Sequence, residues 1–422
     1  MSHASKRLRR VAVVVTAVGT LVAVPSADGT ATATAAPPYA TGTAAVTEAD
    51  PPSPSASGDE VRKLTAAMER KLDATVQRVM RETKVPGGIV GIWMPEQGRY
   101  VNSFGVADKT SRRPMFPDLN MRIGSETKTF TVTALLELVD KGAASLDDPI
   151  GKYISDVPNG DKITLRELAG MRSGLFNYTQ DDDFFKAFTS DPQRPFTPQQ
   201  LLDYAFKHPV LFPPGEKFDY CNTNLILLGL VIEQVSGQHL GDYLQHNVID
   251  PVGLKDTLFP VANEFPTPHS QGYTNQTATG KVEDAADWNP SWGWAAGAMI
   301  SDLEELRVRA RTVATGELPN GDFLISPATQ KQRLTMSPTT IPGAGYGLGI
   351  FNVRGWIGHN GSLPGYESLT VYLPSAETTL VVLLNTDIDY KGAEPSTVFG
   401  EAITKLISPA HVFTLPAEPA AR

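Results

Sequence analysis

Segments with the pattern of β-strands lie near both ends of this chain of 422 residues, and helix-like segments lie between them. The strand-like segments span residues 89–93 and 99–105 near the start, and 368–372 and 379–384 near the end. Helical periodicity marks residues 61–79, 129–142, 225–235, 303–314 and 396–407. This order predicts an α/β (α+β) fold in which both ends of the chain build one antiparallel sheet flanked by helices. An all-α subdomain is inserted in the middle, and we expect a cleft between the two.

The first residues have the composition of a secretory signal peptide. Lys6, Arg7, Arg9 and Arg10 precede an apolar stretch at 11–24, and small residues suited to cleavage follow. The apolar stretch is shorter than the roughly 20 residues of a membrane span, so we expect a secreted, extracytoplasmic protein without a stable span.

The rest of the chain divides by composition. We assign residues 1–35 to the signal peptide and 36–58 to a disordered linker rich in Ala, Thr, Pro and Ser. A single folded domain is expected at 59–410, with a tail at 411–422. Within that domain the sheet should come from about 59–115 and 295–410, and the helical subdomain from about 116–294.

Composition also limits the partners of this chain. The net charge of -9 argues against a nucleic-acid partner, which would require a basic face. Cys221 is the only cysteine, so no internal disulfide can form and stability must come from the core. The seven histidines show no H-x-H or H-E-x-x-H spacing, and we expect neither a metal nor another cofactor. A monomer is the expected state.

Ser125 and Lys128 lie three residues apart at the start of the helical stretch at 129–142. At that spacing the hydroxyl and the amine share one face of a helix and can exchange a proton. A serine hydroxyl is a weak nucleophile until a base takes its proton, and a lysine becomes such a base when burial or positive neighbours lower its pKa. S-x-x-K recurs by chance in long chains, so its interpretation depends on the rest of the site.

Tyr220 and Asn222 lie on a loop just before the helix-like stretch at 225–235. The Tyr220 phenol could be held as phenolate or relay protons, and the Asn222 amide could hold a substrate carbonyl. An aromatic residue and a turn-forming asparagine before a helix would also explain Y-x-N without any chemistry. By itself this motif decides nothing.

A third motif, His359-Asn360-Gly361-Ser362, opens the strand-rich C-terminal part. Gly361 at a sheet edge would let a substrate backbone approach, and the N–H of Ser362 could pair with that of Ser125 as an oxyanion hole. His359 fits a hydrogen-bonded structural role better than that of a base, because a lysine already lies beside the serine.

The motifs S-x-x-K, Y-x-N and H-x-G, in this order, resemble those of the serine β-lactamase and penicillin-recognising DD-peptidase superfamily. The resemblance is closest to its secreted, soluble D-alanyl-D-alanine carboxypeptidases and extends from about 60 to 408. It includes the connecting phrases L-D-D-P at 146–149, I-T-L-R-E-L at 163–168, S-G-L at 173–175, F-P-P-G at 212–215, A-G-A-M-I-S at 296–301 and Y-G-L-G at 346–349. The resemblance implies a β-lactamase/transpeptidase-like fold.

The resemblance also implies a role for each motif residue. Ser125 would be the acylated nucleophile, Lys128 would activate it, and Tyr220 would deliver a proton to the leaving nitrogen. Asn222 would hold the substrate amide carbonyl, and the backbone N–H groups of Ser125 and Ser362 would bind the oxyanion. Two further positions match aromatic walls of the cleft in family members, although ordinary packing would explain them equally well: Trp292 and the pair Phe184-Phe185.

Three positions depart from the pattern of the carboxypeptidases. Those that bind a terminal D-Ala carboxylate carry an arginine cluster after Y-G-x-G and a threonine in H-T-G, whereas this chain has Phe351 and Asn360. Arg354 could substitute as a bidentate partner of a carboxylate. Cys221 replaces the serine common in Y-S-N, and we interpret it as a small packing residue.

These observations predict an exported serine hydrolase of the D-alanyl-D-alanine carboxypeptidase type, acting on peptidoglycan stem peptides through an acyl-enzyme on Ser125. Its partners would be small peptides or β-lactams and cell-wall peptidoglycan. An esterase, a β-lactamase or a D-amino-acid amidase of the same fold is the alternative, favoured by Phe351 and Asn360. A non-catalytic penicillin-binding module is a further alternative, against which Ser125, Lys128 and Tyr220 argue. The G-x-S-x-G motif of α/β-hydrolases is absent from the chain.

Overall fold

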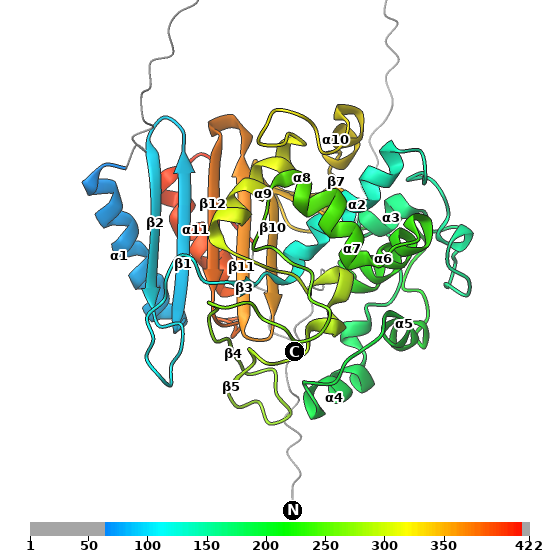
Figure 1. Ribbon diagram of the computed structural model, residues 1–422, viewed down its shortest axis with the longest axis horizontal. Coiled ribbons are helices and arrows are strands. Elements are labelled where there is room, and N and C mark those ends of the chain that lie inside the picture. Colours follow the sequence, from blue (N-terminus) through cyan, green and yellow to red (C-terminus); the bar gives the residue numbers. More distant parts are fainter. Residues whose placement is uncertain (1–63, 416–422) are drawn as a thin grey trace, which may run out of the picture. The chain divides into compact units, whose positions relative to one another are not determined.

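The computed structural model describes residues 64–415. Within that range, eight antiparallel strands form the main sheet in the order β2-β1-β12-β11-β10-β9-β8-β7 (Figure 1). Both ends of the chain meet inside it, because β1 pairs with β12 from Gly88 opposite Leu384 onward. The predicted antiparallel sheet built from both ends is therefore confirmed. Its strands are β1 (Gly87–Met94), β2 (Gly98–Gly105), β7 (Ser337–Pro338), β8 (Ala344–Tyr346), β9 (Phe351–Val353), β10 (Trp356–Leu363), β11 (Tyr366–Leu373) and β12 (Thr378–Leu384).

Helices pack on both faces of this sheet. On one face α11 (Pro395–Ile407) lies on β11 and β12, and α1 (Ala66–Thr83) packs against α11. On the other face α9 (Leu303–Thr315) lies over β10, β11 and β12. Successive side chains along a strand point to opposite faces of the sheet, which assigns the two faces. Leu369 lies against Gly400 of α11. Gly91 is one position past the β1 residue that shares a cross-strand row with Leu369, so it faces the other side, where it lies against Leu303 of α9.

The middle of the chain is mostly helical and lies beside the strands in Figure 1. It includes α2 (Thr127–Asp140), α3 (Leu165–Ala169), α4 (Asp182–Ser190), α5 (Pro198–Phe206), α6 (Asn222–Ser236), α7 (Leu240–Leu244) and α8 (Asp250–Val252), with α10 (Pro327–Arg333) further along the chain. Short pairings join β3 (Met121–Arg122) to β6 (Ile300–Ser301), and β4 (Tyr273–Thr274) to β5 (Glu283–Asp284).

Helix α2 is buried over nearly its whole length, whereas its sequence pattern indicated one apolar face. The difference arises from its threonines, which are small enough to be buried and whose hydroxyls bond to backbone. Thr131 Oγ1 donates to the Ala295 carbonyl oxygen at 2.7 Å, and Thr133 Oγ1 donates to that of Thr129 at 2.6 Å. Burying these polar residues therefore leaves no hydroxyl unpaired.

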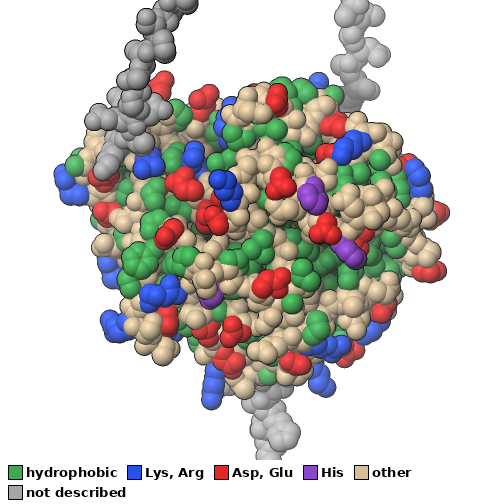
Figure 2. Space-filling view, viewed as in Figure 1, with side chains coloured by type: hydrophobic (Ala, Val, Ile, Leu, Met, Phe, Trp, Pro, Cys, Tyr) green, Lys and Arg blue, Asp and Glu red, His purple; other side chains and the backbone are tan. Residues whose placement is uncertain are grey.

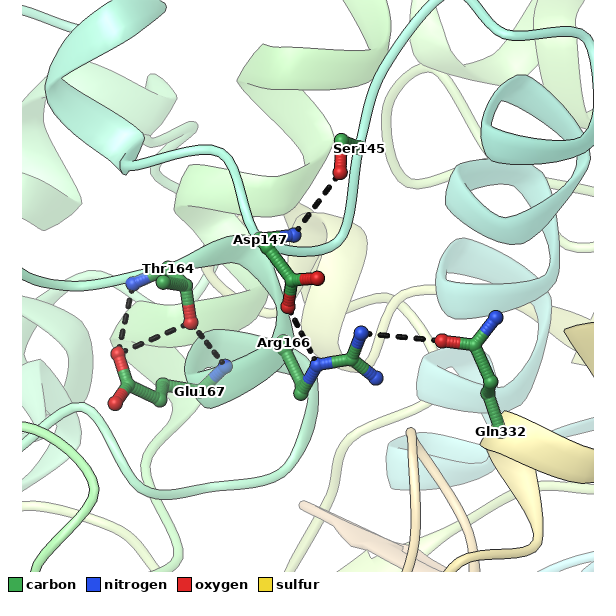
Figure 3. A network of polar contacts seen from close by, with 6 residues as sticks. All are labelled: Ser145, Asp147, Thr164, Arg166, Glu167 and Gln332. Atoms are coloured by element: carbon green, nitrogen blue, oxygen red, sulfur yellow. Dashed lines mark hydrogen bonds and ion pairs between the residues drawn. The ribbon is translucent and has the colours of Figure 1, made fainter.

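Two of the connecting phrases meet in a polar network on the helical side (Figure 3). Thr164 and Glu167 form a capping box that starts α3, in which the Thr164 hydroxyl accepts from the Glu167 N–H. Arg166 donates to Asp147 Oδ1 at 2.8 Å and to Gln332 Oε1 of α10 at 3.1 Å. The network therefore ties L-D-D-P, I-T-L-R-E-L and α10 together, which gives these phrases a structural role.

Element boundaries differ from those expected at a few places. The helix expected at 61–79 begins at Ala66, after an N-cap by Thr65, and the one expected at 225–235 begins at Asn222. The expected tail at 411–422 is wrong in its first residues, because the Phe413 side chain is buried in the core. The expected signal peptide and linker, residues 1–58, lie outside the described residues.

No helix in residues 64–415 is both long and apolar enough to cross a membrane. On the face shown in Figure 2, acidic and basic side chains are interspersed.

Candidate active site

Ser125 lies on the short 3₁₀ turn η1 (Gly124–Glu126), which leads directly into α2. Two glycines allow this turn to lie against the backbone of β10. A Cβ on Gly361 would approach the Ile123 carbonyl oxygen to 1.9 Å, and one on Gly124 would approach the Ser362 nitrogen to 2.7 Å. Gly124 also has φ of +51°, which favours glycine. The Ser125 turn therefore lies against Gly361 and Ser362, and the backbone that approaches Gly361 is that of Ile123 in this chain, whereas the sequence suggested a substrate backbone there.

Lys128 lies in the first turn of α2 and is fully buried. Its Nζ lies 2.8 Å from Ser125 Oγ and donates to the Ala296 carbonyl oxygen, also at 2.8 Å. Burial lowers the pKa of Lys128 well below 10.5, because the charged form loses its hydration. A lowered pKa makes the Lys128 amine better able to accept the Ser125 proton.

Tyr220 completes the group around Ser125. Lys128 Nζ lies 4.9 Å from the centroid of the Tyr220 ring, and the Phe351 ring is nearly parallel to that ring, with centroids 6.4 Å apart and an interplanar angle of 7°. Burial raises the pKa of Tyr220 far above its usual value, and a hydrogen bond with Ser125 opposes that shift only in part. The resting site therefore holds a phenol rather than the phenolate that the sequence left open.

His359 faces the same group from β10. Its Nδ1 lies 2.5 Å from the Asn360 carbonyl oxygen and its Nε2 lies 3.3 Å from the Tyr346 hydroxyl. Burial, with a smaller effect from the charge of Lys128, lowers the pKa of His359 to about 3. A neutral histidine with a hydrogen-bond partner at each ring nitrogen fits the structural role that the sequence suggested. Tyr346, from Y-G-L-G, lies against Phe351 with ring centroids 4.7 Å apart and was not among the expected site residues.

The Y-x-N loop is fixed by the S-G-L region. The Asn222 N–H donates to Asn177 Oδ1 at 3.2 Å, and its side-chain amide donates to Thr179 Oγ1 at 3.4 Å. Deeper in the helix, the Ser173 hydroxyl donates to Asn224 Oδ1 at 2.6 Å. Asn222 is thus the first residue of α6, is half-buried, and is held in position by these hydrogen bonds.

On the other face of β10, Asn360 makes a contact that the sequence did not predict. Its Nδ2 donates to Glu394 Oε2 at 2.5 Å, and Glu394 is the N-cap residue of α11. Asn360 and Glu394 are 34 positions apart in the chain. No local motif marks Glu394, so only the packing of α11 beside β10 reveals it.

A second carboxyl that the sequence did not single out is Glu126, next to the nucleophile. It is buried, its Oε1 has no hydrogen-bond partner within residues 64–415, and burial raises its pKa to about 8. The side chains of Ser368 and Thr370 on β11 oppose that shift. At neutral pH Glu126 is therefore mostly protonated behind the catalytic turn.

The expected aromatic walls lie in a cluster of rings. Phe184 is buried and packs edge-on against Tyr178 at 5.2 Å and at 6.2 Å from Trp292, so its assignment as a cleft wall is replaced by a packing role. Trp292 is half-buried, and its carbonyl oxygen accepts from the Tyr178 hydroxyl at 2.5 Å. For Phe184, the pattern of closely spaced aromatic residues therefore indicates core packing.

The remaining departures are also resolved. Arg354 lies in the turn between β9 and β10, where its carbonyl oxygen faces His411 at 2.8 Å and its side chain lies beside Gly343. It is thus at the opposite end of β10 from Gly361 and does not substitute for the missing arginine cluster. Cys221 is buried, and burial raises the pKa of its thiol to about 12, as suits a packing residue. Within residues 64–415, no group of three His, Cys, Asp or Glu side chains could hold a metal.

Comparison with known sequences identifies the family of this chain. The Beta-lactamase family model matches residues 72–397. A D-aminopeptidase from Cereibacter sphaeroides is 26% identical over 341 residues, covering 78% of this chain and 62% of the relative. Protein flp from Staphylococcus aureus is 25% identical over 337 residues, covering 78% and 65%. The chain thus spans less than two thirds of the length of these relatives.

Solved structures match over more of their length. A D-stereospecific amidohydrolase from Streptomyces sp. has a TM-score of 0.70 and 29% identity, with 82% of this chain and 98% of that chain covered. The D-amino acid amidase from Ochrobactrum anthropi SV3, complexed with L-phenylalanine amide, has a TM-score of 0.70 and 26% identity, covering 82% and 97%. A penicillin-binding protein homologue from Pyrococcus abyssi has a TM-score of 0.68 and 26% identity, covering 80% and 77%. With the family model matching residues 72–397, this chain belongs to the Beta-lactamase family and has its serine hydrolase fold.

Proposed function

We propose that this protein hydrolyses amides of D-amino acids through an acyl-enzyme on Ser125. The observation that carries the proposal is the combination of a lysine base next to Ser125 with aromatic rings around Tyr220. In the described part of the chain, no lysine or arginine other than Lys128 hydrogen-bonds to or stacks on Tyr220, Phe351 or His359. A site of this kind suits an uncharged amide better than a peptide that ends in a carboxylate.

The reaction would begin with proton transfer from Ser125 to the neutral amine of Lys128 as Oγ attacks the amide carbon. The carbon–nitrogen bond would break as Tyr220 gives its phenol proton to the leaving nitrogen, and the proton held by Lys128 would restore the phenol. Water would then attack the ester on Ser125 and give one proton to Lys128, which would return it to Ser125 Oγ as the ester bond breaks and the D-amino acid leaves. The N–H groups of Ser125 and Ser362 would stabilise the oxyanion in both steps.

Two similar proteins support amides over carboxypeptidase substrates. One is named a D-aminopeptidase and another a D-amino acid amidase, and neither name refers to a terminal carboxylate. Phe351 and the distant position of Arg354 point the same way, since they leave no guanidinium where a carboxylate would need one.

The proposal is tested with a panel of substrates. Wild-type protein should hydrolyse D-phenylalanine amide with a kcat/KM at least about tenfold above that for L-phenylalanine amide. Ser125→Ala should show no turnover and no acyl adduct by mass spectrometry, whereas Ser190→Ala, an exposed serine at the end of α4, should match wild type. Faster hydrolysis of D-alanyl-D-alanine than of D-amino acid amides would overturn the assignment in favour of a carboxypeptidase.

We also propose that the protein acts outside the cytoplasm, because the first 35 residues have the composition of a signal peptide. N-terminal sequencing of the protein from the culture medium should find a start near residue 36. Full-length protein retained inside the cell would contradict export without bearing on the reaction.

A further inference from the structure

The contact between Asn360 and Glu394 places a carboxylate beside the H-x-G strand. Residues directly opposite each other on neighbouring strands share a face, so Asn360 points to the α11 side together with Leu369. Glu394 is the residue at the N-cap position of α11, and its Oε2 accepts from Asn360 Nδ2 at 2.5 Å. Both side chains are half-buried, so they remain within reach of solvent and of a bound molecule.

Glu394 contributes negative charge to this region, because its charge raises the pKa of both Glu367 and Tyr220. Glu367 is 1% exposed, and Glu367 Oε2 accepts from the Ser396 N–H at 2.7 Å. Burial first and the charge of Glu394 second raise the pKa of Glu367 well above its usual value. Glu367 therefore stays protonated, while Glu394 lies at the N-terminus of α11, where the helix dipole favours a carboxylate.

The charge of Glu394 reaches the reacting groups. After burial and the hydrogen bond with Ser125, Glu394 is the next largest influence on the Tyr220 phenol, and it stabilises the protonated form. In the proposed function Tyr220 gives its proton to the leaving nitrogen, so Tyr220 marks the leaving-group side of the scissile bond. The charge of Glu394 therefore acts on that side.

The open edge of β10 lies next to this charge. β9 pairs with β10 only from Trp356 to Gly358, so residues 359–363 have a strand partner on one side, β11. An extended substrate can add along such an edge, and its leaving group would then run past Asn360.

We infer that Glu394, held by Asn360, is a specificity-determining residue that rejects a carboxylate in the leaving group and admits a neutral or ammonium-bearing one. This inference rests on the proposed function, because that function places the leaving nitrogen at Tyr220. It assigns the substrates of the site to D-amino acid amides and D-peptides whose leaving group carries no negative charge. Asn360 acts as the positioning residue for the side-chain carboxylate of Glu394.

The test compares substrates that share the D-alanyl acyl group and whose leaving groups carry different charges. We choose D-alanyl-D-alanine, its C-terminal amide, and D-alanine 2-aminoethylamide, which carry a carboxylate, no charge and an ammonium. Wild-type kcat/KM should rise in that order, with about tenfold or more between the first and the last. Glu394→Gln keeps the size of the side chain and its bond to Asn360, and should bring the three values to within about threefold of one another.

A matched control is Glu401→Gln, which makes the same change on the exposed part of α11, where Glu401 pairs with Lys405. It should keep the wild-type order. An unchanged order in folded Glu394→Gln would overturn the inference. If that variant does not fold, the wild type alone provides the test, since its charge discrimination should fall between low salt and about 1 M salt; a discrimination that does not depend on salt would overturn the inference.

Failure of the inference and failure of the proposed function are distinguishable. The ester pair D-alanyl-D-lactate and D-alanyl-D-lactamide varies the same charge without needing amide cleavage. If esters alone were hydrolysed, the proposed amidase function would fail. A preference for lactamide that is lost in Glu394→Gln would still support the role of Glu394, and equal turnover of the two esters by wild type would overturn it.

Discussion

Lys128 has no carboxylate partner among residues 64–415, and its amine lies against Ser125, the Tyr220 ring and the Ala296 carbonyl oxygen. Its pKa is held below 10.5 by burial, so between the lowered value and 10.5 the unfolded chain binds a proton that the folded protein does not. Wild-type stability therefore rises with pH across that window. Lys128→Met should abolish acylation yet raise the free energy of unfolding at neutral pH, on the order of 1–2 kcal/mol.

The check is urea unfolding of both proteins at neutral pH and near pH 10.5, combined with mass spectrometry after exposure to a penicillin. The stability gain should shrink towards the higher pH, because Lys128 is then neutral in the unfolded chain as well. Lys405→Met on exposed α11 serves as the control and should show no such trend. Acylation of Lys128→Met, or a clear loss of stability at neutral pH, would refute this account of the base.

At the scale of elements, the turn η1 and strand β11 enclose Glu126. The pKa of this carboxyl is about 8 in the folded protein and about 4.5 in the unfolded chain. Between those values the folded state holds the extra proton, so this group makes stability fall as the pH rises. Glu126→Gln should therefore match wild type near pH 4.5 and exceed it by about 2–4 kcal/mol at pH 8. Chemical unfolding at both pH values measures this, and a constant difference would contradict it.

Helices α9 and α10 each direct an arginine onto α2. Arg309 donates to the Thr129 carbonyl at 2.9 Å and to Thr133 Oγ1 at 2.7 Å, and Arg333 donates to the same two oxygens at 3.0 and 2.9 Å. Both are buried, and burial and the mutual repulsion lower the pKa of Arg309. Arg309→Met removes one of two like charges while Arg333 still satisfies both acceptors.

The expected result for Arg309→Met is a free energy of unfolding that is unchanged or higher by up to about 2 kcal/mol. The cation–π contact with Phe130 is lost, which limits the gain. Arg307→Met, at an exposed arginine of the same helix, should change stability by less than about 0.5 kcal/mol. A loss above about 2 kcal/mol in Arg309→Met would mean that the arginine pair is net stabilising.

The elements show which parts of this molecule a sequence can predict. Strands β1 and β12 and helices α6 and α9 follow from local periodicity, and Ser125, Lys128 and Tyr220 follow from short motifs, because both signals are local. Glu126 and Glu394 were not predicted, since their burial and charge depend on β11 and α11, which are distant in the chain. For Phe184 the sequence left two interpretations open, a cleft wall and ordinary packing, and only the packing shows that its ring lies in a cluster.

At the scale of the whole molecule, the two ends of the domain support each other. α1 packs on α11, β1 pairs with β12, and the segment after α11 returns to the core. There the Phe413 N–H donates to Thr404 Oγ1 at 2.9 Å, and its buried ring lies next to Gly400. The Trp356 indole of β10 also donates to the His411 carbonyl at 2.5 Å. This segment therefore closes the face of the sheet on which α11 and Glu394 lie.

Phe413→Ala should destabilise the protein by about 3–5 kcal/mol, because it removes a buried aromatic ring and leaves a cavity against α11. The matched control is Phe116→Ala, at a phenylalanine that is 47% exposed, which should cost less than about 1 kcal/mol. Urea unfolding measures both. Because Gly400 and Glu394 belong to the same helix, the loss should also weaken charge discrimination among leaving groups while Ser125 still acylates. Equal costs for the two variants would show that the chain after α11 is a tail, as its sequence first indicated.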